Sequence, residues 1–88
     1  MELNVVLTQA VGLRSTPVEV KSTIEVAVLS IDNVRNALEA LFWRSMRNAD
    51  FNYYADVDAK VELIDPAAVM TVRRSSNNSY TGKAWELV

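Results

Sequence analysis

A single segment of this chain, from Asp32 to about Asn48, places its apolar side chains at helical intervals. Val34, Leu38 and Leu41 fall on one stripe of that segment, which contains no Gly or Pro. The segments before and after it alternate apolar and polar residues instead, as half-buried strands do. Because one helix can cover only one face of a sheet, this pattern predicts a fold of the α+β class.

Two alternating segments precede the helix. Residues 3–13 and 18–28 predict a long antiparallel hairpin, in which both strands exceed ten residues and Gly12 is the candidate for a bulge. Asp32 is the predicted N-cap of the helix, because its carboxylate can accept hydrogen bonds from the free N–H groups of the first turn.

Three further strands are predicted after the helix. Residues 57–63 alternate, and the segments 69–74 and 80–88 predict a second hairpin closed by the polar run 75–79. The chain therefore reads as a single α+β domain spanning residues 1–88. Its predicted architecture is an antiparallel sheet of four to five strands, in β-β-α-β-β-β order, with one helix packed on one face.

The sheet face away from the helix is predicted to carry surplus apolar residues. They are Val6, Ala10, Ala27, Leu29, Ile64 and Val69. Such a face favours partial burial against another chain, so a homodimer or a higher oligomer is one expectation.

The composition excludes several kinds of chemistry. The chain contains no cysteine and no histidine, which removes disulfides, thiolate nucleophiles, common zinc sites and the Ser-His-Asp arrangement. The acidic alternation at residues 56–62 lacks the Gly and terminal Glu of a calcium loop. We therefore expect no enzyme, no cofactor and no metal site.

The N-terminal sequence and the charge balance suggest a location and limit the partners. The first residues lack a basic signal region, and no apolar run reaches the roughly 18 residues of a membrane span. Together with the lack of cysteine, this predicts a cytoplasmic protein, in the host cytoplasm if the chain is phage-encoded. Nine basic and eleven acidic residues give a net charge of -2, which makes nucleic-acid binding an unfavoured expectation.

Trp43 points roughly 160° away from the stripe that contains Leu38 and Leu41. A large indole on that outer face needs a partner or a second layer. Trp and Met are enriched at the centres of interfaces, which favours a partner. The alternative is that Trp43 folds down over Tyr53 or Tyr54 and closes a small core at the end of the helix.

The predicted partner-binding surface combines the outer helix face, the aromatic segment after the helix and a basic hairpin near Lys83. Its candidate residues are Trp43, Met46, Arg47, Ala40, Tyr53, Tyr54, Arg73 and Arg74. The alternative for the two adjacent arginines is an ordinary solvated hairpin end.

These features favour a small, non-enzymatic protein-binding module that acts stoichiometrically. Compact domains without motifs occur among phage and mobile-element proteins that inhibit host complexes, and by that analogy we expect a viral inhibitor. A self-assembling virion or scaffold protein is the second hypothesis. The third is single-stranded nucleic-acid binding, with bases stacked on Phe51, Tyr53 and Tyr54 and phosphates held by Arg44 and Arg47.

Overall fold

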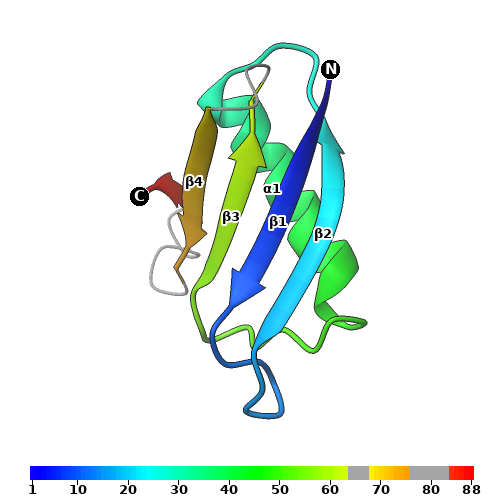
Figure 1. Cartoon of the computed structure of the whole chain (residues 1–88), viewed down its shortest axis with the longest axis vertical. Helices are drawn as coiled ribbons and strands as arrows, with labels where there is room; N and C mark the ends of the chain where they lie inside the picture. The colour runs from blue at the N-terminus through cyan, green and yellow to red at the C-terminus, as the bar shows by residue number, and fades with distance from the viewer. Residues whose placement is uncertain (64–67, 76–83) are drawn as a thin grey trace.

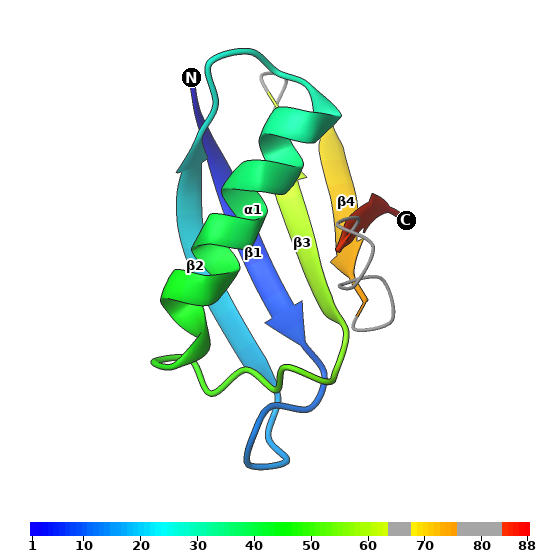
Figure 2. The same cartoon turned by 180° about the vertical axis from the view of Figure 1, so that it is seen from behind.

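The computed structural model describes residues 1–63, 68–75 and 84–88. In these parts the elements are β1 (Glu2–Gln9), β2 (Val18–Glu25), α1 (Ile31–Met46), β3 (Val57–Glu62), β4 (Val69–Arg74) and β5 (Trp85–Leu87). The strands form one antiparallel sheet in the order β2-β1-β3-β4-β5. Figure 1 shows the open face of this sheet, and Figure 2 shows α1 lying diagonally across the other face. The predicted α+β fold and its element order are confirmed.

The core lies between α1 and the inner face of the sheet. Alternate residues of the central strands point toward the helix, and the helix buries its apolar stripe against them. The largest buried side chains are Trp85, Phe42, Phe51, Leu7 and Leu38. No helix in the described parts of the chain is long and apolar enough to cross a bilayer.

The first two strands are shorter than the sequence predicts, because the chain turns tightly at Gly12. Each strand has eight residues, and their pairing ends at Gln9 opposite Val18. Gly12 is buried in the connecting loop, where an added Cβ would overlap Cγ2 of Val18 and lie 2.8 Å from the carbonyl oxygen of Thr16. Gly12 therefore permits a close backbone approach and is not a strand bulge.

The N-cap of α1 is Ser30 and not Asp32. Ser30 has an extended backbone (φ -141°, ψ 156°), and its Oγ accepts a hydrogen bond of 3.2 Å from the N–H of Asn33. This is the geometry of a capping residue, whose C=O also accepts the first helical bond, here from Val34 at 3.0 Å. Asp32 instead lies in the first turn, where its charge favours the helix dipole.

The prediction of a surplus apolar outer face is wrong for the described strands. Only Val6 and Val69 occupy positions on that face, and Val6 lies between Lys21 and Lys60 on the neighbouring strands. Leu29 packs against the core. Three residues lie beyond the strand ends or outside the described residues: Ala10, Ala27 and Ile64.

Candidate functional site

The C-terminal end of α1, the segment that follows it and the β1–β2 loop border a groove of about 710 Å³. We call it the aromatic groove. It is lined by Leu13, Trp43, Arg44, Met46, Arg47, Asn48, Phe51, Asn52, Tyr53 and Tyr54. Its volume falls within the range of typical ligand sites, roughly 300–1,000 Å³. Five of the eight predicted partner-binding residues therefore lie together.

The aromatic side chains of the groove contact one another and remain accessible. The ring of Trp43 lies 5.6 Å from that of Tyr53, which in turn meets Tyr54 edge-on at 5.3 Å. Trp43 is nevertheless 51% exposed and Tyr54 is 79% exposed. Trp43 thus packs against the aromatic segment, as the alternative interpretation predicts, and still presents half of its surface to solvent.

Arg74 lies beneath the aromatic groove and supports its wall. Its guanidinium carbon is 4.2 Å from the ring centroid of Phe42, 5.2 Å from Tyr53 and 5.7 Å from Trp43. Nε donates a 3.0 Å hydrogen bond to Oε1 of Glu39, and the residue is only 3% exposed. The cation therefore attracts three ring faces at once and fixes their positions.

Gln9 holds the segment that carries the two tyrosines. Its Nε2 donates to the carbonyl oxygens of Asn52 at 2.8 Å and Ala55 at 3.2 Å, while its Oε1 accepts from the N–H of Asn52 at 2.7 Å. Gln9 is 2% exposed, so these three bonds satisfy an amide that water cannot reach. The end of β1 thereby fixes the aromatic segment.

A left-handed residue turns the chain after α1. Asp50 has φ 57°, and the N–H of Phe51 donates to the carbonyl oxygen of Met46 at 3.3 Å, which is the 6→1 bond of a Schellman motif. The carbonyl oxygen of Asp50 also accepts a 2.6 Å bond from the N–H of Leu13. The helix end and the β1–β2 loop are joined in this way.

The predicted basic cluster is not formed by Arg73 and Arg74. They are adjacent on β4, so their side chains point to opposite faces of the sheet, with Arg73 on the outer face and Arg74 in the core. Lys83 lies outside the described residues. Ala40 is exposed three residues before Trp43 and does not line the aromatic groove, although it borders another hollow together with Arg44.

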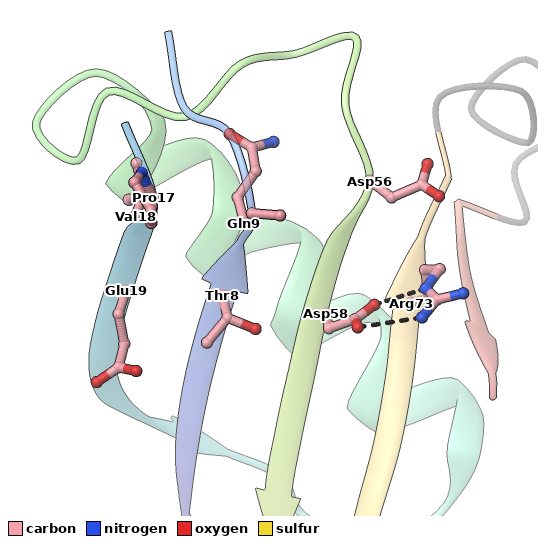
Figure 3. Close-up of a pocket in the computed structure, with 9 residues that line it drawn as sticks. Thr8, Gln9, Pro17, Val18, Glu19, Asp56, Asp58 and Arg73 are labelled. Carbon is pink, nitrogen blue, oxygen red and sulfur yellow. Dashed lines mark hydrogen bonds and ion pairs between the residues drawn. The ribbon is translucent and has the colours of Figure 1, made fainter. Parts of the chain in front are cut away.

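A second hollow, of about 490 Å³, lies on the outer sheet face and contains Arg73 (Figure 3). Arg73 donates two hydrogen bonds to Asp58, from Nε at 2.6 Å and from Nη2 at 3.1 Å. These bonds, together with the negative charge of Asp58 and of the more distant Asp56, raise the pKa of Arg73 above its usual value. The charges of Arg73 and Asp58 are therefore already matched within the domain.

The structure also bears on nucleic-acid stacking, the third hypothesis from the sequence, and on the placement of acidic side chains. Phe51 is 1% exposed and stacks on Phe42, so it offers no face to a nucleic-acid base. Within the described residues, no three acidic side chains gather closely enough to hold a metal ion.

Sequence reasoning missed Gln9, Gly12 and Leu13 as parts of the site. All three fall within the alternating pattern that predicts a single long first strand, and only Gly12 signals the turn. Gln9 occupies an inward position of that pattern, and a polar residue at such a position is the signal that could have identified it. In comparisons with known proteins, no family model, curated protein or solved structure matches this chain.

Proposed function

We propose that this protein is a non-enzymatic binding module that recognises another protein through the aromatic groove. The observation that carries the proposal is the exposure of three large apolar side chains around one concave site. Trp43 is 51% exposed, Leu13 64% and Tyr54 79%. Exposed apolar residues grouped in this way are typical of interaction surfaces, at which Trp and Tyr contribute much of the binding energy.

The support of the groove also favours binding. Gln9 bonds to the backbone of the segment that carries the tyrosines, and Arg74 contacts the rings of Trp43 and Tyr53, so less conformational freedom of these groups is lost when a partner docks. The proposed action is stoichiometric covering of a partner surface, as expected of a phage or mobile-element inhibitor of a host complex. We place it in the cytoplasm, a location that the absence of cysteine favours.

Affinity capture with matched variants tests this proposal. The wild-type chain is expected to retain a stoichiometric partner from host lysate, and Tyr54→Ala and Trp43→Ala to lose it. Val69→Ala is the control, because Val69 is 50% exposed on the opposite sheet face and should retain the partner. Equal capture by all four proteins would show that the aromatic groove is not the binding surface.

Self-assembly is the second candidate, and strand β2 favours it. β2 forms one edge of the sheet with eight residues and no Pro or Gly, whereas β5 at the other edge has three. A long edge strand presents unpaired N–H and C=O groups to a further strand. If the β2 strands of two copies paired antiparallel with Thr23 opposite Thr23, Lys21 of each copy would lie opposite Glu25 of the other.

Light scattering across a concentration series tests self-assembly. The solution mass of the wild-type protein is expected to rise with concentration toward that of a dimer. Thr23→Lys is expected to remain a monomer, because the two introduced lysines would face each other across the paired β2 strands. Thr71→Lys on β4, away from that edge, is the control that should still dimerise. A wild-type chain that stays monomeric at high concentration would rule this candidate out.

A further inference from the structure

The charges around the aromatic groove have one sign. Two arginines and no Asp or Glu occur among the described residues that line it, although the whole chain has more acidic than basic residues. Arg44 and Arg47 are exposed, and neither forms an ion pair within the described residues. Asp50, a nearby carboxylate, already faces Arg14 at 3.8 Å. Arg44 also borders a separate hollow with Glu2 and Glu25, without an ion pair to either. The groove therefore combines apolar side chains with two arginines that form no ion pair in the described residues.

We infer that the aromatic groove binds an acidic peptide segment of a partner protein. In this complex, one large apolar side chain of the segment fills the space between Leu13, Trp43 and Tyr54. Asp or Glu residues on either side of that anchor pair with Arg44 and Arg47. The inference rests on the proposed function and names the chemistry of the partner.

The spacing on α1 suits such a segment. Arg44 and Arg47 are three residues apart, so their side chains leave neighbouring positions of the same helix face. Each guanidinium can bind a carboxylate through two hydrogen bonds. Trp43 precedes Arg47 by four residues and therefore also lies beside it. An apolar anchor and adjacent carboxylates can be engaged together.

Two other occupants fit the same surface less well. A two-fold contact of two copies centred on this groove would bring Arg44 and Arg47 close to the same residues of the partner, and like charges oppose that contact. Single-stranded nucleic acid would find only two unpaired arginines for its phosphates and no access to Phe51.

Selection from a random dodecapeptide display library tests the inference, with the whole chain as bait. The selected peptides are expected to share an aromatic residue or Leu with at least two Asp or Glu nearby. They should not bind Tyr54→Ala, which a melting curve should show to be folded because Tyr54 is 79% exposed. One selected peptide, remade with Asn and Gln for Asp and Glu, should bind at least about tenfold more weakly, equivalent to about 1.4 kcal/mol.

A variant that reverses the charge of both arginines tests the proposed ion pairs directly. The double variant Arg44→Glu and Arg47→Glu should lose the acidic peptide and bind the version in which Lys replaces its Asp and Glu. Suppose instead that the selected peptides bind through the groove but are not enriched in Asp or Glu. That result would overturn this inference and leave the proposed function standing. If a twelve-residue oligothymidylate bound more tightly than the selected acidic peptide, that result would also overturn the inference. Failure to enrich any peptide would overturn this inference, while the proposed function is decided by the affinity capture. Enrichment of peptides whose binding Trp43→Ala and Tyr54→Ala do not affect would overturn both.

Discussion

Arg74 shows how a charged residue can be part of a core. Its guanidinium is in contact with Phe42, Trp43 and Tyr53 and bonds to Glu39, so the loss of hydration on burial is offset by ring faces and a carboxylate. The same contacts determine where the exposed aromatic rings lie. Arg74 consequently contributes both to the stability of the domain and to the shape of the aromatic groove.

Arg74→Met is expected to lower the free energy of unfolding by about 2 kcal/mol, because the cation–π contacts are lost and Glu39 loses its partner. Urea denaturation measures the change. Arg73→Met is the matched control and should leave the urea midpoint unchanged, because the Arg73–Asp58 pair is exposed to solvent. An equal decrease in the free energy of unfolding in both variants would contradict a core role for Arg74.

Gln9 gives a pH-dependent prediction. In Gln9→Glu, an ionised carboxylate would face the carbonyl oxygens of Asn52 and Ala55, which the wild-type amide meets as a donor. Folding should therefore raise the pKa of the new carboxyl above its unfolded value of about 4.3. The variant then keeps its stability below that unfolded value and loses it as the pH rises through the folded pKa.

Thermal melts at about pH 4 and pH 7 test this prediction. The difference in melting temperature between wild type and Gln9→Glu should widen toward pH 7. Gln9→Ala adds no titrating group, so its melting temperature should fall below that of the wild type by the same amount at both pH values. A Gln9→Glu deficit that does not change with pH would show that residue 9 is more open to water than its 2% exposure implies.

Single residues also show where sequence-based prediction failed. The sequence identified Trp43, Met46, Arg47, Tyr53 and Tyr54, which line the groove, because helical spacing and sequence proximity place them near one another. Contacts between distant segments, such as those of Gln9 with residues 52 and 55, leave no periodic signal in a single chain.

At the scale of elements, α1 begins where a hydroxyl can cap it. Asp32 is the stronger candidate from charge, but Ser30 is the residue with extended backbone and a side-chain bond to Asn33. The prediction placed the boundary two residues too late because both positions carry residues favoured as caps. The backbone angles and the side-chain hydrogen bond seen in the structure distinguish them.

Replacement of the two candidate caps should reveal this difference. Ser30→Ala is expected to destabilise the domain by about 1 kcal/mol, because the N–H of Asn33 loses its acceptor. Asp32→Ala should cost at most about 0.5 kcal/mol, because it removes only a dipole interaction and an exposed ion pair with Arg35. Chemical denaturation measures both changes, and the reverse ranking would identify Asp32 as the functional cap.

At the scale of the whole molecule, the element order and the single antiparallel sheet were predictable. Period-two and helical patterns report which side of each element is apolar, and one helix leaves few ways to cover one sheet. The polar outer face was not predictable, because the pattern was continued past the strand ends. Once the strands stop at Gln9 and Glu25, most of the surplus apolar positions leave that face.

The path of the chain separates residue 1 from the aromatic groove. Met1 lies beside Val26 at one end of the molecule, whereas the end of α1 and the β1–β2 loop lie at the other (Figure 1 and Figure 2). A second polypeptide fused ahead of Met1, or a solid support attached there, would therefore emerge far from Trp43 and Tyr54. The domain could be tethered by that end and still leave the aromatic groove open to solvent.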